Sequence, residues 1–243
     1  MPGEKLLALP PRPQAPLAEP NAAIFRPIHY LGSKLRIIDE ISAAVDLLDP
    51  EHNPVCDLFA GSGTVSLALS RSRPTTAVDI QEYSRVLCSA LLKPAYIYTN
   101  DLARLFHQAR TSKHAELVSW ATEPLAAYEA QCIEQALAGK HGALCDLTEH
   151  GSPLAFQKGT STASSSGLRK ALSEFTHRLA KAKLSEHTGM QTTRYFGGIY
   201  FSYAQAAALD NLVEAVHKAP PANRNSLLAI ILSTASDIVN TVG

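Results

Sequence analysis

The sequence is short of the features that would place it in several common functional classes. Only four of its 243 residues are cysteines, and no two of them stand close enough for a C-x-x-C motif. No cluster of histidines surrounds them, so we expect neither a metal site nor a disulfide. We interpret Cys56, Cys88, Cys132 and Cys145 as small buried residues of a protein from a reducing compartment.

An excess of charge and a long apolar run are missing as well. The 22 basic residues balance the 22 acidic ones, so the chain as a whole is not attracted to nucleic acid or to a membrane surface. No apolar run reaches the roughly 18 residues of a membrane span. Prolines at positions such as Pro10, Pro11 and Pro13 interrupt any signal-peptide core. The sequence therefore predicts a cytoplasmic protein without a membrane partner.

The chain is long enough for one large domain, or for one domain with an added lobe. Residues 1–25 are rich in proline, and we expect them to form a flexible tail. Apolar spacing in the part that follows, 26–100, predicts helices and strands in alternation. The expected helices cover 34–48, 64–69 and 81–92, and the expected strands cover 54–58 and 75–79.

Residues 101–194 predict a mainly helical insertion, with a serine- and glycine-rich stretch at 159–167 that we expect to be a mobile loop. Residues 195–243 should return to the first unit and end in two helices. Apart from 54–58 and 75–79, only 96–99 is a further strand candidate, and it fits a loop equally well. A doubly wound α/β sheet has more strands than this, so the sheet looks incomplete.

The most informative stretch is a glycine turn between the first expected strand and the helix after it. It reads DLFAGSG from Asp57 to Gly63, and an acid, Asp79, closes the second expected strand. Backbone amides at such a turn can approach a ligand closely, and an acid at that position can accept hydrogen bonds from two ribose hydroxyls. A turn with glycines for tight packing alone is the alternative.

The details of the turn separate the nucleotide-type ligands. A P-loop would need a lysine after its last glycine, where Thr64 stands, and the dinucleotide fingerprint needs a glycine or alanine at Ser66. The D-x-F-x-G-x-G form that remains is typical of enzymes that bind S-adenosylmethionine.

Three separated blocks resemble the Dam-like class of adenine-specific DNA methyltransferases: HYLGSKLRIIDEI at 29–41, DLFAGSGTVS at 57–66 and AVDIQEYS at 77–84. A looser match covers 194–212. The resemblance implies an α/β fold with a Rossmann-like S-adenosylmethionine-dependent methyltransferase sheet and an inserted, mainly helical lobe. It also implies methyl transfer from S-adenosylmethionine to the exocyclic amino group of adenine in double-stranded DNA.

The resemblance further assigns roles to single residues. Tyr30 would lie against the cofactor, Gly32 belongs to the same block, and Lys34 would pair with the methionine carboxylate unless it is simply solvated. The wall around the methionine head would consist of Asp57, Phe59, Gly61 and Gly63, although Asp57 also suits a cap and Phe59 a core position. Asp79 would hold the ribose and Ile80 the adenine ring, whereas Tyr83 fits either core or ligand contact.

One family motif has no counterpart. These enzymes carry a D-P-P-Y-like motif that holds the adenine amino group and stacks on the flipped-out base. The two Pro-Pro pairs here, Pro10-Pro11 and Pro220-Pro221, have neither an acid nor an aromatic ring in register. We therefore assign no catalytic residue and interpret the chain as truncated before that motif.

The segment 168–194 is the clearest basic stretch of this neutral chain. It carries six basic residues against Glu174 and Glu186, which predicts either a solvated helix face or a surface for DNA phosphates. The six are Arg169, Lys170, Arg178, Lys181, Lys183 and Arg194.

Two other classes of function remain open. The chain fits a non-catalytic module, such as one half of a split enzyme that works with a complementary chain carrying D-P-P-Y. It also fits a methyltransferase for RNA or a small molecule, or an oxidoreductase that binds a nicotinamide cofactor.

Overall fold

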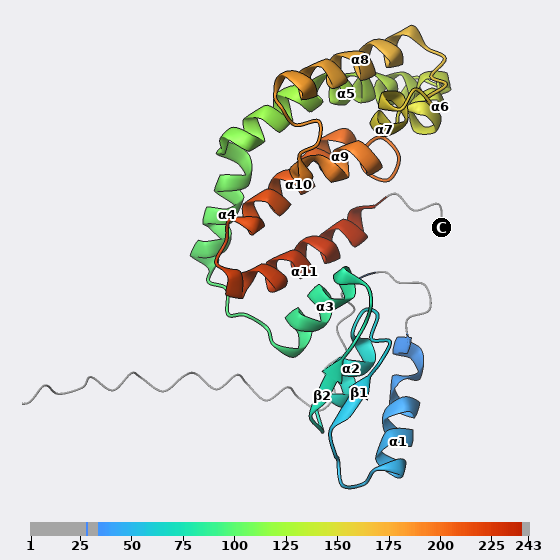
Figure 1. Cartoon of the computed structure of the whole chain (residues 1–243). Helices are drawn as coiled ribbons and strands as arrows, with labels where there is room; N and C mark the ends of the chain where they lie inside the picture. The colour runs from blue at the N-terminus through green and yellow to red at the C-terminus, as the bar shows by residue number, and fades with distance from the viewer. Residues whose placement is uncertain (1–27, 29–33, 240–243) are drawn as a thin grey trace, which may run out of the picture.

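A small parallel sheet and its connecting helix form one end of the molecule (Figure 1). The computed structural model describes residue 28 and residues 34–239. Strand β1 (Val55–Asp57) pairs in parallel with β2 (Thr75–Ala77), with Val55 opposite Thr75. Helix α2 (Thr64–Leu69) connects them and confirms the helix expected at 64–69. Both strands are shorter than expected: β1 lacks residues 54 and 58, and β2 lacks residues 78 and 79, which belong to the loop after it.

Of the predicted Rossmann-like α/β fold, the structure contains one strand–helix–strand unit, formed by β1, α2 and β2. The described residues contain a two-stranded sheet, and the candidate strand at 96–99 is a loop that leads into a helix. The other regular elements of residues 34–239 are helices, apart from an isolated bridge between Gly197 and Phe201. Two strands alone do not make a Rossmann-like sheet.

The sheet is covered on one face and open on the other. The middle residues of the two strands, Cys56 and Thr76, are registered partners and are both exposed, while their neighbours along each strand are half-buried. The expectation that Cys56 is a buried core residue is therefore wrong, because its side chain projects from the open face. Cys145 is exposed too, whereas Cys88 and Cys132 are buried as expected.

Helix α1 (Ile38–Leu48), which follows a 3-10 turn η1 (Lys34–Ile37), is fastened to the sheet by a buried guanidinium. The side chain of Arg73 has no exposed surface and forms ion pairs with Asp46 and, at 2.7 Å, with Asp49. Because a buried cation needs such partners, the end of α1 and the start of β2 are held together.

The remaining helices form the larger part of the molecule (Figure 1). Helix α3 (Glu82–Leu92) packs against the last helix, α11 (Pro221–Ile238), and α10 (Tyr203–His217) packs against α4 (Thr99–Thr111) and α5 (Lys113–Leu137). Helices α5 and α8 (Ser166–Lys181) run side by side. The shorter elements are α6 (Gly142–His150), α7 (Pro153–Gln157), η2 (Thr188–Met190) and α9 (Gln191–Phe196).

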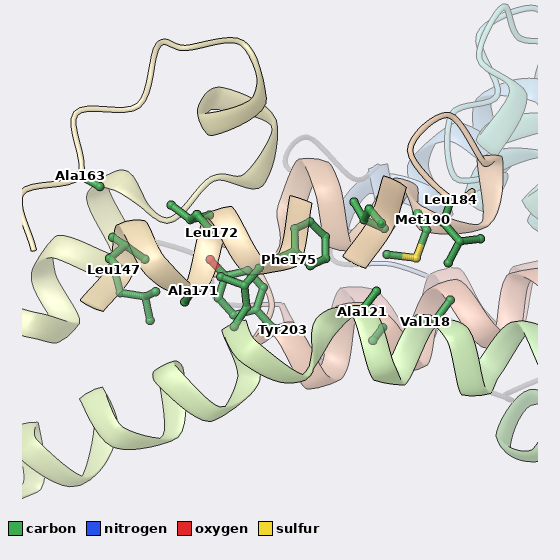
Figure 2. Packing of buried hydrophobic residues seen from close by; sticks show 14 of the residues in the cluster. Val118, Ala121, Leu147, Ala163, Ala171, Leu172, Phe175, Leu184, Met190 and Tyr203 are labelled. Carbon is green, nitrogen blue, oxygen red and sulfur yellow. The ribbon is translucent and has the colours of Figure 1, made fainter. Parts of the chain in front are cut away.

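The main apolar core lies between α5, α8 and α10. Figure 2 shows Leu172 and Phe175 of α8 close to Tyr203, with Ala121 and then Val118 of α5 farther along the core. The hydroxyl of Tyr203 donates a hydrogen bond to the Gly151 carbonyl. The apolar spacing of 168–179 predicted this buried face of α8.

The loop expected to be mobile at 159–167 is anchored at its end. Ala163 is buried, and the carboxylate of Asp146 accepts hydrogen bonds from the backbone N–H groups of Ser164 and Ser165 at 3.0 Å. Burial opposes ionisation of Asp146, but these hydrogen bonds outweigh it and lower the pKa of its carboxyl to about 2. Asp146 thus fixes the start of α8.

Helix α5 passes through Pro124 without ending there, although a proline in a helix removes one backbone hydrogen bond. The carbonyl that loses its partner is that of Trp120, four residues earlier. Arg178 of α8 donates to this carbonyl at 2.8 Å and to Glu123 at 2.9 Å. Arg178 therefore replaces the missing donor and joins the two helices.

No helix among residues 34–239 is both long and apolar enough to cross a membrane.

We expect Arg178→Ala to lower the free energy of unfolding by about 1–3 kcal/mol, because it leaves the Trp120 carbonyl without its donor. Urea denaturation followed by circular dichroism measures this. Lys181→Ala is the matched control, since Lys181 lies over the same Trp120 ring and its loss should cost below about 1 kcal/mol. In a Pro124→Ala background, which restores the backbone N–H, the cost of Arg178→Ala should shrink; an equal cost in both backgrounds would contradict the role.

Candidate functional site

A cavity of about 370 Å³ opens between the glycine turn after β1 and the end of β2. Five of the residues proposed for cofactor binding line it together: Lys34, Phe59, Gly61, Asp79 and Ile80. The volume falls in the range of small-molecule and cofactor pockets. The loops after two adjacent parallel strands therefore meet at one hollow, as the order of motifs in the sequence suggested.

The carboxylate of Asp79 bridges the two loops that form this cavity. One oxygen accepts the N–H of Gly61 at 2.8 Å, and the other accepts the N–H of Gln81 at 2.8 Å. The hydrogen bonds from Gln81 and then Gly61 hold the pKa of the Asp79 carboxyl below its usual range. Asp79 is thus an anion at neutral pH that faces the turn.

The glycine turn depends on left-handed backbone at two positions. Gly61 has φ of +53° and Gly63 has φ of +79°, a region that costs other residues energy. A Cβ at Gly61 would meet nothing within 4 Å, whereas one at Gly63 would lie 3.1 Å from Cys88 Sγ and 3.1 Å from Leu91 Cδ1. Gly61 therefore lines the cavity, and Gly63 lies against α3 and outside it.

Two large apolar side chains stand in the open at this cavity. Ile80 is 98% exposed and Phe59 is 82% exposed. Apolar groups gathered around a polar hollow are typical of a site that a ligand covers. Phe59 is therefore not the core residue that the alternative interpretation allowed.

The remaining predicted residues lie apart from the cavity or outside the described chain. Asp57 does not line the cavity, and its carboxylate accepts the buried hydroxyl of Ser66 at 2.7 Å. This hydrogen bond ties the end of β1 to α2, but it is not the cap on the glycine turn that the alternative interpretation allowed, because no side chain caps the start of α2. Tyr30 and Gly32 lie outside the described residues, and so does the tail expected at 1–25.

Several residues that line the cavity were not predicted from the sequence, and for Tyr83 the sequence did not decide between a core position and a ligand contact. Gln81 directly follows Asp79 and donates its backbone N–H to the Asp79 carboxylate. A backbone contact of this kind cannot be recognised from the type of the side chain. Tyr83, for which core and ligand contact were both considered, lines the cavity. The other lining residues, none of which was proposed to contact a ligand, are Ala60, Ser62, Thr64 and Val65.

The six basic residues of 168–194 fall into two groups, arginines that contact other parts of the protein and lysines that are exposed. Besides its bonds to α5, Arg178 pairs with Glu174 at 2.8 Å. Arg194 is buried beside Gln157, with Glu186 at 3.8 Å, and Arg169 donates to the carbonyls of Ala163 and Ser164. The exposed lysines of the set are Lys170, Lys181 and Lys183.

The cavity combines an anion, backbone of a glycine turn, a lysine and exposed apolar surface. Such a set suits a ligand with hydroxyl groups, a flat apolar ring and a carboxylate. The described residues at the cavity include no cysteine or histidine, and the Asp79 oxygens already accept backbone hydrogen bonds.

Residues 30–225 match the family model of the D12 class N6 adenine-specific DNA methyltransferases, and this span contains the cavity and most of the helical part. Neither the curated proteins nor the solved structures provide a match to the chain.

We expect Gly63→Ala to destabilise the protein more than Gly61→Ala. Both changes put an alanine in left-handed backbone, at a cost of about 1–2 kcal/mol. Gly63→Ala also forces Cys88 and Leu91 to move, which adds about 1–3 kcal/mol. Thermal and urea unfolding of the two variants give the comparison, and Cys88→Ala should recover part of the Gly63→Ala loss. Equal losses would show that the turn is not packed as described.

Proposed function

The chain belongs to the D12 class of N6 adenine-specific DNA methyltransferases, and from that premise we propose that its cavity binds S-adenosylmethionine. In this proposal the chain supplies the cofactor site and part of the substrate lobe for methyl transfer to the exocyclic amino group of adenine in double-stranded DNA. The bound cofactor would supply the electrophilic methyl group.

The observation that carries the proposal is the position of Asp79. Each of its two oxygens accepts one backbone hydrogen bond, from the N–H of Gly61 and the N–H of Gln81 respectively. A carboxylate has about four acceptor sites, so these two bonds leave it able to accept from ribose hydroxyls as well. The backbone bonds also fix the orientation of the carboxylate before any ligand arrives, which lowers the entropic cost of binding.

The other lining residues suit the remaining parts of the cofactor. Ile80 offers an apolar face to the adenine ring, and its burial under that ring removes exposed apolar surface. Lys34 would pair with the methionine carboxylate, and Phe59 and Gly61 would border the methionine head. Tyr30 and Gly32 are assigned to the same site by their block alone, and Asp57 and Gly63 would support the turn from behind.

We expect Asp79→Asn to weaken binding of S-adenosylmethionine by roughly tenfold to a hundredfold. Hydrogen bonds to a charged group are worth about 1.5–3 kcal/mol, and each 1.4 kcal/mol is about tenfold in affinity. Isothermal titration calorimetry on the full chain measures the effect. Glu82→Gln is the matched control, since Glu82 pairs with Arg85 on α3 and does not line the cavity.

A second variant separates binding from folding. Ile80→Ser removes a side chain that is almost fully exposed, so it should leave the melting temperature unchanged and still weaken cofactor binding. Wild-type affinity in both Asp79→Asn and Ile80→Ser would refute the proposed site. Binding of a nicotinamide cofactor in place of S-adenosylmethionine would favour the oxidoreductase alternative.

DNA would meet the exposed lysines of the basic segment. Lys170, Lys181 and Lys183 face solvent, and none of them belongs to an ion pair found in residues 34–239. The pKa of the Glu174 carboxyl is lowered mainly by its hydrogen bond from Arg178 and also by the nearby charge of Lys170, so Lys181 and Lys183 are the two whose charge is least offset. Arg178 and Arg194 are already held by carboxylates, so we assign them to the structure of the lobe. Arg169 is held by backbone carbonyls in the same way.

We expect the double reversal Lys181→Glu and Lys183→Glu to weaken binding to duplex DNA and to reduce the slope of log K against log salt by about 2, one for each lost phosphate contact. Fluorescence anisotropy at several salt concentrations measures this. The double reversal Lys93→Glu and Lys140→Glu is the control, because it changes the net charge equally at exposed positions elsewhere. The same loss in both double variants would remove the specific role of 168–194.

A second candidate function rests on the missing D-P-P-Y run in the printed sequence. In this version the chain binds cofactor and DNA, and a complementary chain supplies the motif that holds the target adenine. Transfer of a labelled methyl group to DNA separates the candidates. Activity of this chain alone supports the first, and activity only after addition of a chain with D-P-P-Y supports the second.

A further inference from the structure

Three side chains that are far apart in the sequence converge where α5 begins. They are His114 of α5, His187 just before η2, and Glu214 of α10, and each is half-buried. One potential ligand atom from each lies within 4.8 Å of the others. No spacing pattern in the sequence indicates this cluster, because each residue comes from a different element.

The core fixes the backbone that carries these side chains. His114 lies one turn before Val118, and His187 lies three residues before Met190; Figure 2 shows Met190 near Val118 at the same end of the core. Glu214 directly precedes Ala215 and Val216, which are buried in a second apolar cluster. The rings of His114 and His187 are 4.9 Å apart between centroids. The cluster is therefore built on rigid elements.

Two imidazoles and a carboxylate are a ligand set typical of zinc and related first-row metals, which leave a fourth position for water. His114 already has a supporting partner of the usual kind, since its Nε2 lies 3.3 Å from the Gly189 carbonyl and leaves Nδ1 for a metal. Tetrahedral bonds of 2.0–2.1 Å would place ligand atoms roughly 3.3 Å apart, so small side-chain rotations must close the cluster.

The same ligand atoms have other partners in the structure. The ammonium of Lys218 lies 3.0 Å from Glu214, and the N–H of Gly189 donates to His187 Nδ1 at 2.9 Å. Lys218 is 57% exposed, so it can turn into solvent when another cation takes its place. The N–H of Gly189 would have to give up its bond if the metal used His187 Nδ1. Both contacts compete with the metal.

We propose that His114, His187 and Glu214 bind one first-row divalent transition metal of the zinc class, which fastens α5, the η2 segment and α10 together. This reverses the sequence-based expectation of no metal site, and it is independent of cofactor binding in the cavity near Asp79.

Titration of the full chain with Co²⁺ tests the proposal, after removal of any affinity tag and treatment with a chelator. We expect saturable binding of one Co²⁺ per chain, with visible absorption of a tetrahedral site and a higher melting temperature. His187→Gln and Glu214→Gln should each weaken binding by roughly tenfold or more. Lys218→Met should strengthen it, because the competing ammonium is gone.

His141→Gln is the control, since His141 is an exposed histidine outside the cluster and its loss should leave Co²⁺ binding unchanged. Circular dichroism of each variant without metal checks that it folds, and Lys218→Met leaves all three ligands in place. No saturable binding, or unchanged affinity in both Glu214→Gln and Lys218→Met, would overturn the proposal. So would a sulfur-to-cobalt charge-transfer band, which would assign the binding to the exposed thiols of Cys56 or Cys145.

Discussion

The Asp79 carboxylate, shared between the N–H groups of Gly61 and Gln81, is the contact on which the proposed site depends. It joins a loop after one strand to a loop after the next, so the cavity has fixed walls although the sheet has just two strands among residues 34–239. It also brings an anion next to a backbone that carries no side chain at Gly61. The exposed Ile80 and Phe59 then supply apolar surface around this anion. One hydrogen-bonded carboxylate therefore organises the polar and the apolar part of the same hollow.

The helical part shows how a residue that looks like a ligand can be needed by the fold. Arg178 has the charge and the helical position expected of a phosphate contact, yet it spends its donors on the Trp120 carbonyl freed by Pro124 and on Glu123 and Glu174. Arg194 is likewise enclosed. The lysines around them stay exposed to solvent, which is usual for the strongly hydrated ammonium group of lysine. The planar guanidinium group of arginine is less strongly hydrated and pairs more readily with nearby carboxylates.

Local patterns were sufficient for helix α2, for the existence of the two strands and for the centre of the candidate site. Helix α2 starts and ends where glycine and apolar spacing placed it, and Asp79 and Gly61 meet because parallel strands bring their following loops to one edge. Features that depend on contacts between residues far apart in the chain could not be predicted from the sequence. The exposure of Cys56 follows from what covers the sheet, the anchoring of 159–167 follows from Asp146, and the cluster at His114 follows from helix packing. None of these leaves a periodic or spaced signal in the chain.

The free edges of the sheet have a consequence for how the protein behaves at high concentration. Among the described residues, β1 and β2 each have a neighbour on one side only, so both strands present an edge to which a foreign strand can add. Each edge is only three residues long, and β1 ends in the charged Asp57. An incoming chain would gain few backbone bonds there, and the shortness of the strands thereby protects the molecule from edge-to-edge aggregation.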